Sequence, residues 1–426
     1  MDDAQITTLD SGLRVVSESV ESVRSTALGF WVRSGSRDES AAQAGLSHFL
    51  EHLLFKGTAR FSSFEIDETF DAMGAEVNAG TSKETTSVYS RFMDRHLDRA
   101  LDVMADMVLR PTYPDIDSER QVVIEEIAMY EDEPQDKVHD VLAKAVFGDH
   151  PLGRPIIGQA EVISSVPVPA IASYHRTRYS PQNIVISAAG SIDHDQLVTR
   201  VEQSLDGAPG PSPKGAPETA PAGSEPRVCF HAKETEQYHL CLGALGLPRD
   251  DDRRFALRVL DTILGGSTSS RLFQEVREKR GLAYAVFSYS GHYADSGHVG
   301  LYVGTRPDNV HEAMEVIGTE LTRISTDGVT DAELERAQEN VKGRTTLSME
   351  STLSRMNRLG SSLLMEVPLL SLDEVLAAVD GVTSEDVRQL AAGLFDPSRM
   401  SAAAVGANED VFREALETVN PGLAAA

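Results

Sequence analysis

Residues 44–58 read AGLSHFLEHLLFKGT and place two histidines and a glutamate among leucines and a phenylalanine. In a helix, the apolar residues would form one stripe that faces a core, because they recur at spacings of three and four. His48, Glu51 and His52 would then stand at positions i, i+3 and i+4, so their side chains share one face. Gly57 follows the apolar run and predicts the helix stop.

Two neutral imidazoles one helical turn apart have the spacing of two zinc ligands. The carboxylate of Glu51, between His48 and His52, could take a proton from a water; the order is H-x-x-E-H, the reverse of H-E-x-x-H. The alternative is a pair of surface histidines on an amphipathic helix, because so short a motif needs structural context. A third ligand would distinguish the two.

Length and composition predict a soluble protein of two domains. The chain has 426 residues, more than one core usually holds, and 41% of them are hydrophobic. Its apolar runs are too short to span a bilayer, and the acidic N-terminus shows no secretory signal. The two cysteines, Cys229 and Cys241, flank a possible hairpin and read as core residues of a reducing compartment. We therefore expect a cytoplasmic protein without a membrane partner.

The net charge of -27 argues against nucleic acid as a partner, since such binding rests on Lys and Arg meeting phosphates. It also disfavours anionic membrane surfaces. The stretch 207–226, GAPGPSPKGAPETAPAGSEP, is rich in Pro, Gly and Ala and predicts an extended linker. The predicted domains are therefore 1–206 and 227–426.

Each half mixes strand-like and helical segments, which predicts an α+β fold. Strands are expected in 14–20, 26–35, 183–192, 227–232, 238–247 and 298–306, and helices in 98–110 and 308–324. Both helices are followed by a turn and an acidic helix, 117–131 and 331–344, which indicates a duplicated unit. The repeat sets HFLEH against LRVLD (257–261), so any metal site belongs to the first half.

The acidic helix 117–131 should supply the third ligand. Glu119 and Glu126 are seven residues apart and share a face, whereas Glu125 points about 100° away from Glu126. A carboxylate from a second helix would complete a His, His, Glu site with a fourth position open for water. In the alignment of the two repeats, the equivalent of Glu126 is Lys342, which could not bind a metal ion. On the alternative reading, these glutamates form a solvated helix face.

These segments resemble the pitrilysin family of inverzincin peptidases, most closely the branch of the mitochondrial processing peptidase β subunit and its bacterial relatives. The resemblance continues over nearly the whole chain, through NAGTSKETTSVYSRF, HPLGRPIIG and SSRLFQEVREKRGLAYAV. It implies that His48, His52 and Glu126 are ligands of one Zn²⁺ per chain. It also implies that Glu51 is the catalytic base and Glu119 a supporting acid.

The resemblance also implies where a peptide would bind. In the family, the segment that matches Asn78 and Ala79 lies at a sheet edge, where an extended peptide can add as a further strand. Residues 76–92 have the composition of a strand. Arg277 and Tyr284 match a pair that contacts substrate, and Tyr284 could donate a hydrogen bond to the oxyanion. An ordinary paired strand and a core aromatic residue are the alternatives.

Two functions follow from the resemblance. The first is a zinc endopeptidase that acts on peptides or unfolded protein segments, and the second is a metal-free, non-catalytic subunit. Family members with a complete chamber have four such units, so this chain would be half of a clamshell. A homodimer is the default way to close it, with a heterodimer with an inactive homologue, or a monomer acting in cis, as alternatives.

Overall fold

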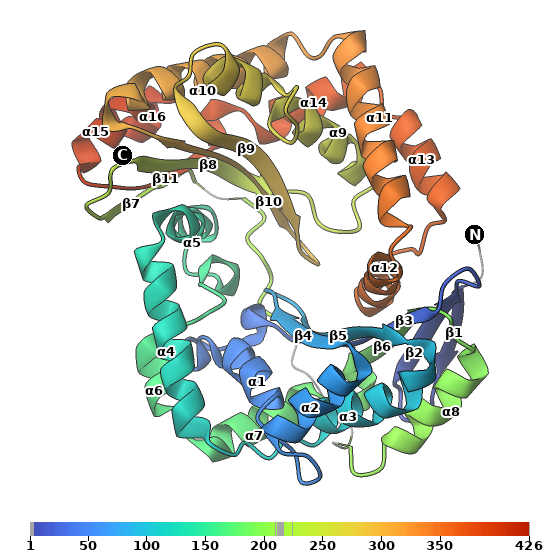
Figure 1. Ribbon diagram of the computed structural model, residues 1–426. Helices are drawn as coiled ribbons and strands as arrows, with labels where there is room; N and C mark the ends of the chain where they lie inside the picture. The colour runs from blue at the N-terminus through green and yellow to red at the C-terminus, as the bar shows by residue number, and fades with distance from the viewer. Residues whose placement is uncertain (1–3, 209, 211–216, 224, 426) are drawn as a thin grey trace. The chain divides into compact units, whose positions relative to one another are not determined.

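The computed structural model describes residues 4–208, 210, 217–223 and 225–425 (Figure 1). The chain forms two compact units, each built around one β-sheet. Unit 1 contains residues 1–127, 155–218 and 346–371, and unit 2 contains residues 128–154, 219–345 and 372–426. The α+β fold class predicted from the sequence is confirmed.

Unit 1 holds a six-stranded sheet in the order β1-β2-β6-β3-β5-β4. Neighbouring strands are antiparallel except β2 and β6, which run parallel. The strands are β1 (Ala4–Thr8), β2 (Arg14–Ser19), β3 (Ser25–Val32), β4 (Glu76–Thr81), β5 (Thr86–Met93) and β6 (Ile184–Gly190). The central strands are buried on both faces, because helices cover the sheet on either side.

Unit 2 holds a five-stranded sheet in the order β7-β11-β8-β10-β9. The strands are β7 (Val228–Ala232), β8 (Tyr238–Gly246), β9 (Ala283–His292), β10 (Gly297–Thr305) and β11 (Ser401–Gly406). Without β1, the order in unit 1 is the same, and β7 and β11 form the single parallel pair as β2 and β6 do. This agreement confirms the internal repeat.

The helices follow the same plan in both units. In unit 1, α2, α3 and α8 lie on one face of the sheet and α12 on the other (Figure 1). In unit 2, α10, α14 and α15 lie on one face and α5 on the other (Figure 1). The bounds are α2 (Ser63–Met73), α3 (Leu97–Leu109), α6 (Ala160–Ser165), α7 (Val168–Arg178), α8 (His194–Ser204), α10 (Val310–Thr326), α13 (Leu372–Asp380), α14 (Ser384–Leu394), α15 (Glu409–Leu416) and α16 (Pro421–Ala424).

One helix from each half packs in the unit formed mainly by the other half. Helix α5 (Pro134–Phe147) packs on β8 and β11, and α12 (Thr352–Leu364) packs on β2, β3 and β6. Met356 and Leu359 of α12 are fully buried against Val16 and Val185. The compact units therefore differ from the predicted domains 1–206 and 227–426 at these exchanged segments.

Three further sequence predictions concern residues 76–92, the two cysteines and the linker. Residues 76–92 form a hairpin, β4 and β5, in place of one strand. Cys229 and Cys241 are free and do not face each other in a hairpin, because β11 lies between their strands. The predicted linker 207–226 lies partly outside the described residues; its described residues form no helix or strand, and Ala220 is buried in unit 2.

No helix in the described parts of the chain is both long and apolar enough to cross a membrane.

Candidate metal centre

Helix α1 (Leu46–Leu54) carries the motif, as the sequence predicted. Its apolar residues are fully buried in the core of unit 1: Leu46, Phe49, Leu50, Leu53 and Leu54. Burial of this stripe fixes the rotation of the helix, so the opposite face, with His48, Glu51 and His52, is directed away from the core.

A buried carboxylate fixes the start of α1. Glu39 accepts hydrogen bonds from the backbone N–H of Gly45 at 2.8 Å and of Ser47 at 2.6 Å. These are N–H groups that a helix cannot satisfy internally, and a negative charge at this end is favourable. Gly45 has φ +95, and a Cβ there would lie 2.6 Å from the carbonyl oxygen of Ile157, so glycine is required.

The second helix of the site is α4 (Ile116–Asp132), which brings Glu119 and Glu126 to the motif. Arg120 anchors it, because its guanidinium donates to the carbonyl oxygens of Ile163 and Val166. The same guanidinium lies 5.5 Å from the ring of Phe49 on α1. Glu119 is buried and Glu126 is half-buried, whereas Glu125 is exposed. The structure thus distinguishes the three glutamates that the spacing left open.

His48, His52 and Glu126 each offer one donor atom, and these atoms lie within 4.8 Å of one another. Glu126 Oε1 is 3.6 Å from His48 Nε2, and Glu126 Oε2 is 3.3 Å from His52 Nε2. In the described part of the chain, no other group of three His, Cys, Asp or Glu side chains meets this criterion. Two imidazoles and one carboxylate are among the ligand sets that zinc ions use in proteins.

The hydrogen bonds around these donors fit a cation. Glu119 Oε1 lies 2.8 Å from His52 Nδ1 and accepts a hydrogen bond from the Nδ1–H group, so Nε2 presents a lone pair toward Glu126. Among the described residues, the buried Oε2 of Glu126 accepts no hydrogen bond, although it lies 3.3 Å from His52 Nε2. Two acceptor atoms that face each other in this way, without a donor between them, are stabilised by a metal ion.

The protonation states suit the same role. Burial, with a smaller contribution from neighbouring His52, lowers the pKa of His48 to about 4, so its imidazole is neutral at pH 7. Neutral imidazole is the form that binds metals. Burial raises the pKa of Glu51, although the hydrogen bond from Thr81 opposes this shift. A carboxylate with a raised pKa is a stronger proton acceptor near neutral pH.

Two side chains of the site were not predicted. Lys56 Nζ lies 2.7 Å from Glu119 Oε2, and Thr81 Oγ1 donates a short hydrogen bond to Glu51. Lys56 lies just after the end of α1 and contacts Glu119 on another helix, so no helical spacing connects the two. Thr81 lies on β4, and no local pattern connects it with α1.

Asn78 and Ala79 lie on β4, which is the edge strand of the sheet in unit 1. They pair on one side with Tyr89 and Val88 of β5, so the other edge of β4 has no strand partner in the sheet. Asn78 is exposed and Ala79 half-buried. An open strand edge of this kind can pair with an extended peptide.

Arg277 and Tyr284 lie together in unit 2. Arg277 is in the π-helical turn Phe273–Glu278 and Tyr284 is on β9, the edge strand of its sheet. The guanidinium of Arg277 lies 4.4 Å from the centre of the Tyr284 ring and donates to the Tyr284 carbonyl oxygen at 3.0 Å. Tyr284 is 78% exposed, so it is not a core aromatic residue.

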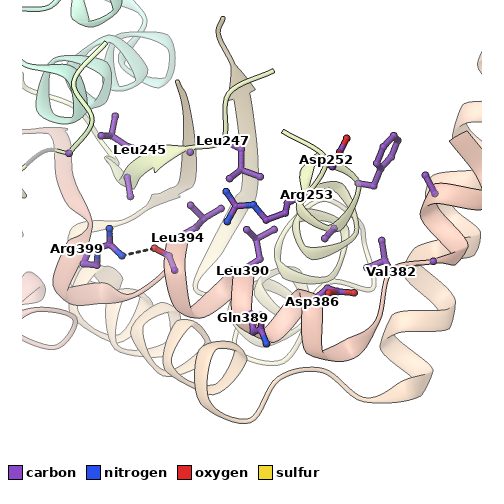
Figure 2. Close-up of a pocket in the computed structure, with 18 of the residues that line it drawn as sticks. Leu245, Leu247, Asp252, Arg253, Val382, Asp386, Gln389, Leu390, Leu394 and Arg399 are labelled. Atoms are coloured by element: carbon purple, nitrogen blue, oxygen red, sulfur yellow. Dashed lines mark hydrogen bonds between the residues drawn. The ribbon is translucent and has the colours of Figure 1, made fainter. Parts of the chain in front are cut away.

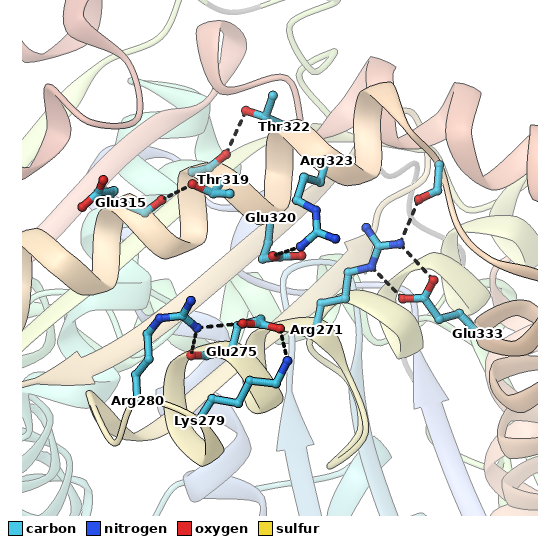
Figure 3. A network of polar contacts seen from close by, with 12 residues as sticks. Arg271, Glu275, Lys279, Arg280, Glu315, Thr319, Glu320, Thr322, Arg323 and Glu333 are labelled. Atoms are coloured by element: carbon cyan, nitrogen blue, oxygen red, sulfur yellow. Dashed lines mark hydrogen bonds and ion pairs between the residues drawn. The ribbon is translucent and has the colours of Figure 1, made fainter.

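Ion pairs hold the segment that carries Arg277. Figure 3 shows Arg271 joined to Glu333 of α11 (Asp331–Ser348), with oxygen–nitrogen distances of 2.7 and 3.0 Å. Glu275 accepts from Lys279 at 2.5 Å and from Arg280 at 2.7 Å (Figure 3). These contacts hold the turn that carries Arg277, one member of the predicted substrate pair.

Unit 1 thus carries a cluster of two histidines and a glutamate that could hold a metal ion. Family models agree: residues 14–160 match "Insulinase (Peptidase family M16)" and residues 165–341 match "Peptidase M16 inactive domain". The chain belongs to the pitrilysin family, peptidase family M16.

Relatives in this family are similar over nearly their whole length. An uncharacterised zinc protease of Streptomyces coelicolor is 43% identical, with 95% of this chain and 90% of the relative covered. An uncharacterised zinc protease of Bacillus subtilis is also 43% identical, with 91% and 95% covered.

Solved structures share the fold. A protease from Helicobacter pylori matches with a TM-score of 0.90 at 22% identity, and covers 95% of this chain and 99% of its own. A peptidase M16 inactive domain from Pseudomonas fluorescens matches with a TM-score of 0.89 at 23% identity, with 95% and 98% covered.

Proposed function

We propose that this chain is a zinc-dependent endopeptidase that hydrolyses peptides or unfolded protein segments, with Glu51 as the general base. The observation that carries the proposal is the convergence of His48, His52 and Glu126 within 4.8 Å, one helical turn from a carboxylate whose pKa burial raises. The names of the relatives, zinc proteases, support the same class of reaction.

His48, His52 and Glu126 would hold one Zn²⁺ per chain, and Glu119 would orient His52 through its Nδ1. When bound, zinc supplies Lewis-acid chemistry: it lowers the pKa of a water to about 7 and polarises a carbonyl. The donor set leaves room for such chemistry because three protein ligands do not complete a tetrahedron.

The chain's own residues would then move the proton. Glu51 takes it from the attacking water and delivers it to the leaving amine. Thr81 holds one carboxylate oxygen of Glu51 by its hydrogen bond, which leaves the other oxygen for the proton. Lys56 and Glu119 keep the ring of His52 in the tautomer that presents Nε2 to the metal.

The edge of β4 at Asn78 and Ala79 would take an extended substrate by main-chain hydrogen bonds, which gives little sequence preference. Arg277 and Tyr284 would contact substrate from unit 2, and the exposed ring of Tyr284 supports this role. A homodimer that forms a closed chamber, the relation to the processing-peptidase branch and a cytoplasmic location stay predictions.

A metal-free subunit is the second candidate. Residues 165–341 match an "inactive domain". This match accords with the absence of metal ligands from the second repeat, in which Lys342 is the equivalent of Glu126. The complete donor set of unit 1 favours the enzyme, because a chain that has lost its metal has no need of converging ligands.

Replacement of Glu51 by Gln tests the proposal. The variant should keep zinc but cleave an unstructured, internally quenched fluorescent peptide about 10²- to 10⁴-fold more slowly, the usual contribution of a general base. Glu125→Gln is the matched control, because Glu125 is an exposed neighbour of Glu126 and should leave cleavage unchanged. Full activity of Glu51→Gln would refute the role of the base, and a wild-type protein that cannot bind zinc would favour the metal-free subunit.

A further inference from the structure

A series of hydroxyl groups in unit 1 connects the proposed base, Glu51, with the start of its own helix. Thr81 of β4 is, within the described chain, the one hydrogen-bond donor to the Glu51 carboxylate. Its Oγ1 lies 3.5 Å from Oγ1 of Thr86, the residue with which it pairs on β5. Thr86 is buried and donates to the carbonyl oxygen of Ser34 at 3.0 Å. A buried residue of the neighbouring strand therefore stands behind the donor to the base.

Tyr174 of α7 continues the series back to α1. Its hydroxyl lies 3.4 Å from Oγ of Ser34 and 2.8 Å from Oγ of Ser47 on α1. Burial raises the pKa of Tyr174 to about 12, so the hydroxyl keeps its proton at neutral pH. Ser47 precedes Glu51 by four residues, so the contacts return to α1 one turn before the base. We call these five residues the hydroxyl network: Ser34, Ser47, Thr81, Thr86 and Tyr174.

The second repeat shows what the fold requires at these positions. Equivalent residues follow from the strand registers and from the alignment of α1 with α9 (Arg254–Leu264). For α7 and α14, they follow from Pro181 and Pro397, which begin the short turns after these helices. Ser34, Ser47, Glu51, Thr86 and Tyr174 correspond, in this order, to Gly246, Ala256, Leu260, Val299 and Leu390.

Unit 2 thus forms the same strands and helices without these hydroxyl groups. Val299 is fully buried and has nearly the shape of Thr86, so the exchange removes little besides the hydroxyl. Leu390 lines a cavity of about 950 Å³, which Gly246 and Ala256 line as well (Figure 2). A buried hydroxyl is costly unless it is hydrogen-bonded, so apolar side chains are the simpler choice for a core. The hydroxyl network occurs in the repeat that carries the base, and the fold does not need it.

From this series of contacts and its absence from the second repeat, we propose that Thr86 and Tyr174 are positioning residues for Glu51. Thr86 gives the Thr81 hydroxyl a second polar contact, which favours the rotamer that donates to the carboxylate. Tyr174 ties the start of α1 to the end of β3, so that the helix keeps Glu51 within reach of Thr81. These roles rest on the proposed peptidase function, because they serve the base of that reaction.

Thr86→Val installs the residue of the second repeat and tests these roles. With the internally quenched peptide, kcat should fall about 10- to 100-fold while KM and zinc content stay unchanged. Thr86→Ser keeps the hydroxyl and should recover most of the lost kcat. In the Glu51→Gln background, Thr86→Val should have no further effect, because no base remains to be positioned. Tyr174→Phe removes only a hydroxyl that is further from Glu51 and should lower kcat by a smaller factor.

Thr26→Val is the matched control for Thr86→Val. Thr26 is fully buried and donates to the carbonyl oxygen of Ser191 at 2.8 Å, at the opposite end of β3 from Ser34. Each valine variant loses one buried hydrogen bond, so the denaturant midpoints should shift alike, but only Thr86→Val should slow cleavage.

Three results would overturn the positioning roles and leave the proposed function intact. They are an unchanged kcat of a folded Thr86→Val variant, an equal loss of kcat in Thr26→Val, and an equal further loss in the Glu51→Gln background. A zinc-loaded wild type that does not cleave the peptide would instead refute the proposed function, and the positioning roles with it.

Discussion

Helices α1 and α9 occupy equivalent places in the two repeats, yet only α1 has a polar face that can bind a metal. Where α1 has His48 and Glu51, α9 has Leu257 and Leu260, which are buried in the core of unit 2. The equivalent of His52 is Asp261, whose pKa burial raises and which accepts a hydrogen bond from Ser288.

The partner helices differ in the same way. Glu126 of α4 faces the two histidines, whereas its equivalent Lys342 of α11 forms ion pairs with Glu339 and Asp380 at 2.6 and 2.7 Å. The second repeat forms both helices, α9 and α11, without the donor side chains of the first. The metal site is therefore a matter of a few side chains on a frame that packs without them.

The largest effect is expected when one ligand is exchanged between the repeats. Glu126→Lys copies the residue of unit 2 and should remove zinc from the purified protein. Zinc affinity should fall by more than the roughly 10- to 100-fold that is typical when a residue hydrogen-bonded to a metal ligand is removed. The reciprocal variant Lys342→Glu should bind no second zinc, because α9 has no histidines. Metal analysis of both proteins would contradict this account if Lys342→Glu gained an ion.

The two repeats should also differ in how low pH affects their contribution to stability. His175 of α7 is buried, its Nε2 donates to the carbonyl oxygen of Val108 at 2.8 Å, and burial lowers its pKa to about 4. Its equivalent in α14 is Ala391. A folded-state pKa below the unfolded value near 6.5 means that this contribution to stability is complete above pH 6.5. It is lost as the pH falls toward 4, by up to about 3 kcal/mol.

Denaturant unfolding of the zinc-free protein, followed by the fluorescence of Trp31, measures this loss, because Trp31 is the single tryptophan and lies in unit 1. His175→Gln cannot titrate in this range. The difference in unfolding free energy between wild type and variant should therefore change between pH 6.5 and 4. A difference that stays constant over this range would show that His175 carries no such linkage.

A smaller effect on zinc affinity is expected from residues that contact a ligand but do not bind the metal themselves. Glu119→Gln removes the charge that holds His52 Nδ1 and should lower zinc affinity about 10- to 100-fold. Lys56→Met acts only through Glu119 and should cost less. Arg323→Met is a control in unit 2, where Arg323 is exposed and pairs with Glu320. Competition with a zinc chelator gives the affinities, and a Glu119→Gln variant of unchanged affinity would remove its assigned role.

The smallest effect concerns how the repeats cooperate. If two chains share one site, with zinc of one chain and Arg277 and Tyr284 of the other, inactive Glu51→Gln and Tyr284→Phe proteins should complement each other. Equal amounts with free exchange give one intact site in half of the dimers, so activity should recover to about a quarter of wild type. No recovery despite demonstrated exchange would place the pair in cis or outside catalysis.

Much of this comparison was predictable from the sequence because its signals are local. The buried stripe of α1, the acidic helix α4 and the strands β2, β3, β6, β7, β8 and β10 follow from periodicity, whereas β1, β9 and β11 were not predicted. The exchange of α5 and α12 does not, since it depends on contacts between segments far apart in the sequence. Thr81 was missed for the same reason: its bond to Glu51 joins a strand and a helix 30 residues apart.

The central claim is that unit 1 holds one zinc ion through His48, His52 and Glu126, and that unit 2 holds none. Metal analysis of the wild type and of the His48→Ala/His52→Ala variant, both incubated with zinc and then desalted, tests it most directly. The account predicts one zinc per chain in the wild type and none in the variant. A wild type that stays free of zinc, or a variant that retains one ion per chain, would contradict it.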